Sequence, residues 1–203
     1  PVSLGLQPLQ VAAGGGLIVP RLELGARVLV ASLRLVQRLP FGWQVALGRG
    51  LGALLHLFGR ERRRIAERNV ERCFPELAAD ARARVVREHF ALLGRSLLER
   101  GMLWYGAPAR LQGLIHVDGD IGAAARRGGP WMWLVPHFVG LEVAAIAVTL
   151  CQRRPVVSIY QRQKAPYLDG VVKAGRLRFG GAEVFPRQAG IRPVLKRIRD
   201  GAV

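Results

Sequence analysis

Apolar residues dominate the first 60 positions of the chain, and arginines are set among them at intervals. The first apolar run extends from Leu22 to Leu39 and the second from Phe41 to Gly59. Three arginines interrupt the first run: Arg27, Arg34 and Arg38. A charge at the centre of a bilayer span costs about 2.5–3.5 kcal/mol on insertion scales, whereas a helix in the membrane interface accommodates it. Residues 21–60 are therefore predicted to form one or two membrane-associated helices, and residues 1–20 to be flexible and without an assigned element.

An arginine-rich segment follows and leads into an amphipathic one. Residues 60–72 hold six arginines around Ile65 and Val70 and predict a basic helix, which ends before Pro75. Its basic face is either an ordinary solvated surface or a surface for lipid phosphates, and the sequence leaves both open. From Ala79 to Trp104 the apolar residues are spaced four, three and four positions apart: Val86, Phe90, Leu93 and Leu97. This spacing is typical of a helix packed against a core.

Beyond Pro108 short apolar runs alternate with helical patterns. Strands are expected at Leu114–Val117, Trp131–Val135, Pro155–Tyr160 and Ala182–Phe185. Helices are expected at Asp120–Arg127, Phe138–Cys151, Pro166–Arg178 and Arg192–Asp200. The alternation predicts an α/β fold for residues 61–203, with a mainly parallel sheet flanked by helices. Hydropathy alone would make residues 131–150 a transmembrane helix, but Pro136 and Gly140 near its middle favour a strand, a turn and a buried helix.

The composition excludes a disordered chain, a collagen and a disulfide scaffold, because half of the 203 residues are hydrophobic and only two are cysteines. Cys73 and Cys151 lie in no metal-binding pattern, which favours a reduced, cytoplasm-facing protein without a metal site. The net charge is +17, from 31 Lys plus Arg against 14 Asp plus Glu. Such a charge attracts nucleic acid, lipid head groups, a phosphorylated substrate or an acidic protein. Three isolated histidines receive no role: His56, His89 and His116.

The segment from Val135 to Glu142 contains the candidate chemistry. On one continuous helix, residues five positions apart point about 140° away from each other, so His137 and Glu142 would not share a site. If Pro136 ends a strand and the helix begins after His137, the two side chains can converge where open α/β sheets bind ligands. Glu142 would then orient the imidazole, whose other ring nitrogen could act as a general base for a hydroxyl. The same spacing also arises in ordinary cores and surfaces, so the context must decide.

That context is a resemblance to the lipid A biosynthesis acyltransferases, the lauroyl and myristoyl transferases of Gram-negative bacteria. The matching blocks occur in order along the chain: Leu39–Phe41, Arg62–Val70, Cys73–Glu76, His137–Glu142, Tyr160–Pro166, Gly175–Gly180 and Gly190–Arg192. They cover the chain from about residue 20 to its last residue. Several blocks in the right order are far more specific than the histidine box alone.

The resemblance implies an acyl transfer on a glycerol-3-phosphate acyltransferase-like fold, without a cofactor. His137 would be the base and Glu142 its orienter, moving an acyl chain from an acyl carrier protein thioester to a hydroxyl of a lipid A precursor. Arg162 and Arg176 become candidates for holding the phosphates of the acceptor or the developing oxyanion. The enzyme would lie on the cytoplasmic face of the inner membrane. The positive charge would attract both the acidic carrier protein and the phosphorylated acceptor.

Other interpretations remain beside this one. The histidine box is shared by acyltransferases that act on other phospholipid or glycolipid acceptors. A nucleic-acid-binding module is a second alternative, although Trp131, Trp133 and Phe138 lie in apolar runs and are not interleaved with arginine as stacking residues usually are. Nucleic acid is therefore not expected as a partner, and a non-catalytic membrane-bound remnant is a third alternative. Because the family continues beyond the point where this chain stops, the 203 residues are expected to be an incomplete enzyme with little or no activity.

Overall fold

The computed structural model describes residues 18–120, 126, 132–151 and 155–202. Its helices are α1 (Ile18–Val36), α2 (Phe41–Phe58), α3 (Arg60–Cys73), α4 (Ala79–Tyr105), α5 (Pro108–Leu114), α7 (Leu141–Cys151), α8 (Pro166–Leu177) and α9 (Arg192–Arg199). Its strands are β1 (Val156–Tyr160) and β2 (Ala182–Pro186), and a short 3-10 helix η1 (Arg187–Ala189) follows β2. Most of the expected helix at residues 120–127 lies outside the described residues. So do residues 1–17 of the segment expected to be flexible, and Trp131 of an expected strand.

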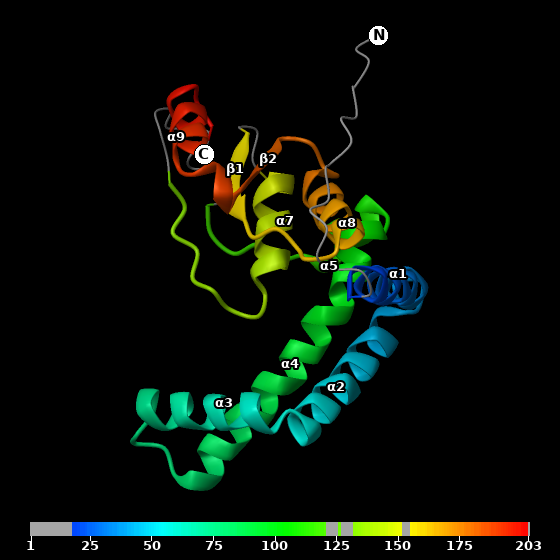
Figure 1. The fold of residues 1–203 in the computed structure, drawn as a ribbon. Coiled ribbons are helices and arrows are strands. Elements are labelled where there is room, and N and C mark those ends of the chain that lie inside the picture. The colour runs from blue at the N-terminus through cyan, green and yellow to red at the C-terminus, as the bar shows by residue number, and fades with distance from the viewer. Residues whose placement is uncertain (1–17, 121–125, 127–131, 152–154, 203) are drawn as a thin grey trace.

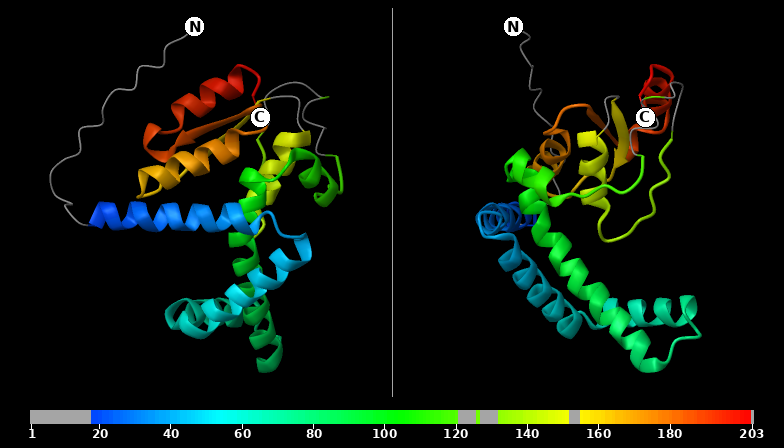
Figure 2. Two further views of the ribbon diagram at one scale, coloured as in Figure 1. Left: turned by 90° about the vertical axis from the view of Figure 1, so that its right-hand side faces the viewer. Right: turned by 180° about the vertical axis from the view of Figure 1, so that it is seen from behind.

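The described elements form two parts that share helix α4 (Figures 1 and 2). Helices α2 and α3 with the first half of α4 extend away as a helical arm. The other part is layered, with α7 and α8 on one side of the two strands and α9 on the other. Helix α1 lies against both α4 and α8, so it connects the arm to the layered part.

The predicted helices in the first 105 residues are confirmed, and local sequence explains where they end. Residues 21–60 form two helices because Pro40, at the N-cap of α2, has no N–H to continue a helix. Helix α3 stops at Cys73, and Phe74 has φ −134°, as expected for a residue that precedes proline. On α4, Val86 and Phe90 of the predicted stripe are buried. Within the described residues, no helix combines the length and apolarity needed to cross a bilayer.

Glycines allow α2 and α4 to pack with their backbones in contact. A Cβ added at Gly94 would lie 2.3 Å from the carbonyl oxygen of Gly48 and 2.3 Å from the backbone nitrogen of Gly52. A Cβ at Gly52 would lie 2.2 Å from the carbonyl oxygen of Phe90. No larger side chain fits at this crossing, so three glycines from distant parts of the chain fix the geometry of the arm.

The two predicted strands near the end of the chain are confirmed. Strands β1 and β2 pair in parallel, with Val156 opposite Ala182 and Tyr160 opposite Pro186. Helix α8 connects them, as parallel strands require. The described part of the chain is therefore mostly helical with one small parallel sheet, an α/β arrangement. A larger sheet of the glycerol-3-phosphate acyltransferase kind stays a prediction.

Two other strand predictions are wrong where the structure describes them. The apolar run 114–117 is the end of α5 followed by residues without regular structure, because Pro108 starts a helix that continues through Leu114. The second wrong prediction is the strand at residues 131–135. Residues 132–138 have no regular structure, and Met132 and Leu134 are 79% and 96% exposed. An apolar run forms a strand only where a neighbouring edge accepts its backbone hydrogen bonds, and β1 pairs with β2 instead.

A hydrophobic core cluster lies where α1, α4, α5 and α7 meet. Its buried members are Leu33, Met102, Leu103, Trp104, Leu111 and Ile146. Burying a side chain of this size contributes about 1.5–3 kcal/mol. The cluster therefore holds α7, which carries Glu142, against the C-terminal half of α4.

Candidate functional site

His137 lies in the irregular segment before α7, and its side chain is exposed. A turn separates His137 from α7, which begins at Leu141. In this turn the N–H of Leu141 donates a hydrogen bond of 3.2 Å to the carbonyl oxygen of Phe138. The histidine and Glu142 therefore do not lie on one continuous helix. The predicted strand before His137 is absent from the described residues, so the histidine is not at a strand end.

Glu142 is in the first turn of α7 and is directed toward α8 rather than toward the histidine. Its side chain is 11% exposed and accepts hydrogen bonds from the guanidinium of Arg176, whose side chain is 24% exposed. The Nε of Arg176 lies 3.1 Å from Oε1 and 3.4 Å from Oε2 of Glu142, and Nη2 also contacts Oε1. No hydrogen bond joins His137 to Glu142 in this structure, in which both residues are described.

The pairing of Glu142 with Arg176 combines two of the residues predicted from sequence in a different way from the one expected. Arg176 is in the last turn of α8, 34 positions after Glu142. A guanidinium with five donors matches a carboxylate in planar geometry. The ion pair joins α7 to α8 and sets the direction of the Glu142 carboxylate. Removing either residue would leave the other charge nearly buried and without a partner, which is unfavourable.

Arg162 lies in the loop between β1 and α8, with its side chain exposed. The described residues provide no ion-pair partner for it, which leaves its guanidinium available to an anion. The loop itself is held by Asp169, in the first turn of α8. Its Oδ1 accepts a hydrogen bond of 2.8 Å from the backbone N–H of Gln163, and its Oδ2 one of 3.3 Å from the hydroxyl of Tyr160. Asp169 therefore sets the position of the residues around Arg162.

Sequence reasoning missed Asp169 and also Ser96. The hydroxyl of Ser96, on α4, donates to the carbonyl oxygen of Val139 at 3.0 Å and ties the turn between His137 and Glu142 to the long helix. An aspartate one turn after Pro166 is a recognisable signal of a helix start. Nothing local indicates Ser96, because its partner is 43 positions away.

The chemistry available at this site is that of a base, a carboxylate and guanidinium donors. His137 is exposed and faces solvent, the Glu142–Arg176 pair is nearly buried one turn further along, and Arg162 offers a free cation. Among the described residues, no group of three His, Cys, Asp or Glu side chains is placed to hold a metal ion. These side chains can accept protons and bind anions.

Comparison with known proteins shows which family the sequence matches. The model of the family described as bacterial lipid A biosynthesis acyltransferase matches residues 21–203. The chain is 30% identical over 149 residues to the lipid A biosynthesis palmitoleoyltransferase of Escherichia coli K12, covering 72% of this chain and 48% of that protein. It is 30% identical over 180 residues to the lipid A biosynthesis lauroyltransferase of the same strain, covering 86% and 56%.

The lipid A biosynthesis myristoyltransferase of that strain is 29% identical over 157 residues, covering 76% of this chain and 47% of the relative. The chain thus spans about half the length of the curated relatives it matches. No solved structure matches it significantly.

Proposed function

Because this chain belongs to the bacterial lipid A biosynthesis acyltransferases, we propose that the protein transfers a fatty acyl chain to a hydroxyl of a lipid A precursor. The observation that carries the proposal is the family match across residues 21–203, which includes all four predicted site residues. The acyl donor in this proposal is an acyl carrier protein thioester. The net charge of +17 supports it, because both an acidic carrier and a phosphorylated acceptor are attracted by a positive protein.

In the proposed reaction His137 is the general base. Its unprotonated ring nitrogen accepts the proton of the acceptor hydroxyl while that oxygen attacks the thioester carbonyl carbon. The tetrahedral intermediate then breaks its C–S bond, and the imidazolium returns the proton to the leaving thiolate. The products are the acyl ester and the free carrier thiol. The exposed position of His137 supports this role, because two large substrates must reach the imidazole.

Glu142 is proposed to orient the imidazole when substrate is bound. Its Oε2 receives only the 3.4 Å contact from Arg176, so it retains lone pairs that can accept a hydrogen bond from the ring N–H of His137. Catalytic hydrogen bonds are often long or absent until substrate binds. Along the chain, the turn at residues 139–140 separates the histidine from the carboxylate.

The arginines divide their roles in this proposal. Arg176 holds the Glu142 carboxylate in place through the ion pair, which makes it a positioning residue. Arg162 is exposed and has no carboxylate partner among the described residues, and we assign to it the contact with the phosphate or the developing oxyanion. The sequence-based prediction gave both arginines the second role, and the pairing with Glu142 favours this division.

We further propose that α1 and α2 hold the enzyme at the cytoplasmic face of the inner membrane. Large apolar side chains are exposed on both helices, with Leu24 65% and Leu35 66% exposed on α1, and Trp43 66% and Phe58 75% exposed on α2. Exposed apolar surface of this kind marks a contact with a membrane or another protein. A phosphorylated lipid acceptor would be reached from the same surface.

The test uses the protein expressed from its whole reading frame in a Gram-negative strain that lacks one late lipid A acyltransferase. Mass spectrometry of the lipid A is expected to show a gain of one acyl chain. His137→Ala is expected to lower the transfer rate about 10²–10⁴-fold while membrane binding persists. His116→Ala, in the irregular segment after α5, is the matched control and is expected to leave the rate unchanged.

Unchanged lipid A mass with the wild-type protein would refute the acceptor. A gain of acyl chain on glycerophospholipids instead would assign the enzyme to another branch of acyltransferases. Near-normal transfer by His137→Ala would reject the histidine as the base, whatever the acceptor.

A further inference from the structure

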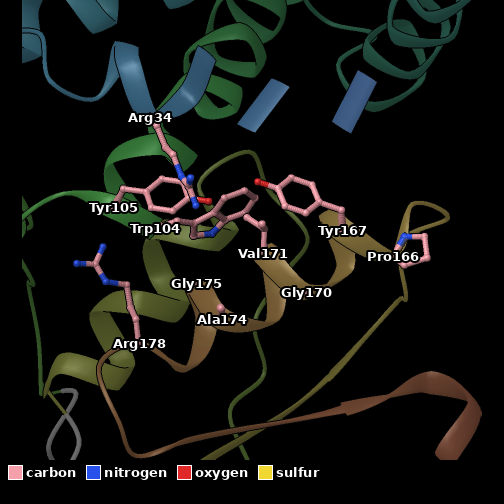
Figure 3. A pocket seen from close by; sticks show the side chains of 10 residues that line it. All are labelled: Arg34, Trp104, Tyr105, Pro166, Tyr167, Gly170, Val171, Ala174, Gly175 and Arg178. Carbon is pink, nitrogen blue, oxygen red and sulfur yellow. The ribbon is translucent and has the colours of Figure 1, made fainter. Parts of the chain in front are cut away.

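A cavity of about 500 Å³ lies between α1, the C-terminal end of α4 and α8, apart from the Glu142–Arg176 pair. Figure 3 shows its lining, in which Tyr105 and Tyr167 extend toward each other from opposite sides and Arg34 reaches in from α1. Val171, Ala174 and Gly175 of α8 form an apolar wall. A second hollow of about 300 Å³ shares Arg34 and Tyr167 and continues along α1 past Arg27 and Arg38. Together they form one groove, called here the α1–α8 groove.

In the part of the chain that the structure describes, no carboxylate forms an ion pair with the arginines of the groove. The guanidinium of Arg34 lies 4.7 Å from the centre of the Tyr105 ring, and that of Arg27 lies 4.8 Å from the centre of the Tyr167 ring. Neither arginine has an ion-pair partner among the described residues. Glu23, one turn before Arg27, instead accepts a hydrogen bond of 3.3 Å from the backbone N–H of Tyr167. The arginines are thus held in place by aromatic rings, with their donors available.

Two further donors in the lining also lack partners. Nε1 of Trp104 and the hydroxyl of Tyr105 are buried, and neither has a hydrogen-bond partner among the described residues. Buried polar groups in proteins nearly always have one. With unpaired guanidinium and hydroxyl donors, the groove favours a ligand rich in acceptor oxygens.

The periodicity of α1 places an apolar surface beside this charge. On a helix of 3.6 residues per turn, Arg27 and Arg34 point within about 20° of each other and so form one stripe along α1. The exposed residues Leu24, Val28 and Leu35 fall between about 60° and 100° from that stripe. The buried residues Val30 and Leu33 fall on its other side. A ligand with an anionic head on the stripe would therefore lay its hydrocarbon on the exposed apolar face.

We propose that the α1–α8 groove binds the phosphate of an amphiphile, with its head group between Arg27, Arg34 and the two tyrosines. The forked guanidinium suits phosphate, whose oxygens can accept hydrogen bonds from two arginines at once. The ligand is either an anionic glycerophospholipid of the bilayer or a phosphorylated glycolipid. This site goes beyond the proposed reaction and does not depend on it, because binding is measured without transfer.

The experiment is calorimetric titration of the protein with soluble short-chain lipids. The probes are dihexanoyl phosphatidic acid and an N-acyl glucosamine 1-phosphate, and the control ligand is dihexanoyl phosphatidylcholine. The double variant Arg27→Gln with Arg34→Gln is expected to bind both phosphate monoesters roughly ten-fold or more weakly than wild type. Arg21→Gln is the control, because it removes one positive charge from α1 at a position outside the groove. It is expected to bind as wild type.

Tyr105→Phe keeps the charge and the helix and removes only the unpartnered hydroxyl, so a weakening of several-fold supports the site even if the double variant is unstable. Tighter binding of the glucosamine phosphate would identify a glycolipid as the ligand, and tighter binding of the phosphatidic acid a bilayer phospholipid. Equal binding would show that the groove recognises the phosphate that the two probes share. Equal affinity in wild type, the double variant and Tyr105→Phe would overturn the proposal, as would equal losses in Arg21→Gln and the double variant. His137→Ala is expected to keep wild-type binding, which separates this test from that of the reaction.

Discussion

Replacing Arg176 with methionine would leave the Glu142 carboxylate nearly buried and without its cation. The Glu142 side chain is 11% exposed, and Arg176 supplies all of its hydrogen bonds from side chains in the described structure. Breaking a buried ion pair by removing one partner typically costs about 3–5 kcal/mol. Because the Arg176 side chain is 24% exposed and water can reach the pair from that side, the expected loss is reduced to about 2–3 kcal/mol.

The assay is urea unfolding of wild type, Arg176→Met, Glu142→Gln and the double variant. The double variant is expected to be more stable than Arg176→Met, because it removes the unpaired charge together with its partner. Arg197→Met is a matched control, since Arg197 pairs with Glu183 at a surface where both side chains are about a third exposed, and its loss is expected to be much smaller. Two results would show that Arg176 does not hold Glu142: equal losses of stability in Arg176→Met and Arg197→Met, or a double-mutant cycle without coupling. Either result would also contradict the proposal that Arg176 positions the Glu142 carboxylate.

Two further changes test the packing and the electrostatics of the fold. Gly94→Ala is expected to lower stability by about 3 kcal/mol or more in denaturant unfolding, because its Cβ would meet backbone atoms of α2 that have no room to move. Gly25→Ala, in open space on α1, is expected to raise stability by about 0.5–1 kcal/mol, and equal effects at the two sites would contradict the close crossing. The hydrogen bond from Arg197 holds the pKa of Glu183 below its ordinary value of 4.5, so its contribution is present above that pH and is lost as the pH falls below it. The stability difference between wild type and Glu183→Gln is therefore expected to shrink between about pH 5 and 3, whereas a difference that stays constant over this range would argue against the ion pair.

Much of the helical structure could be predicted from local sequence. Pro40 and Pro75 divide the first helices, and the stripe through Val86 and Phe90 identifies the buried side of α4. The final β–α–β unit was also predictable, because its strands are short, apolar and separated by a helix that begins at Pro166. These features depend on backbone restrictions and periodicity, which are local properties of the chain.

The predicted strand at 131–135 shows where local reasoning fails. Residues 132–135 have the apolar composition of a buried strand, yet Leu134 is 96% exposed and no strand pairs with it among the described residues. A helix satisfies its own backbone, whereas a strand depends on a partner elsewhere in the chain. Composition therefore predicted this segment less well than it predicted the helices.

The amino-acid sequence by itself determined the candidate residues: the histidine box with His137 and Glu142, and the arginines in the later blocks. Only the tertiary structure decided how they combine, by directing Glu142 onto Arg176, 34 positions away, and leaving His137 exposed. It also decided that α1 lies against α8, which creates the groove lined by Arg34 and Tyr167. The physical reason is that residue identity fixes which charges and donors exist, whereas partner choice depends on distances between elements that only packing sets.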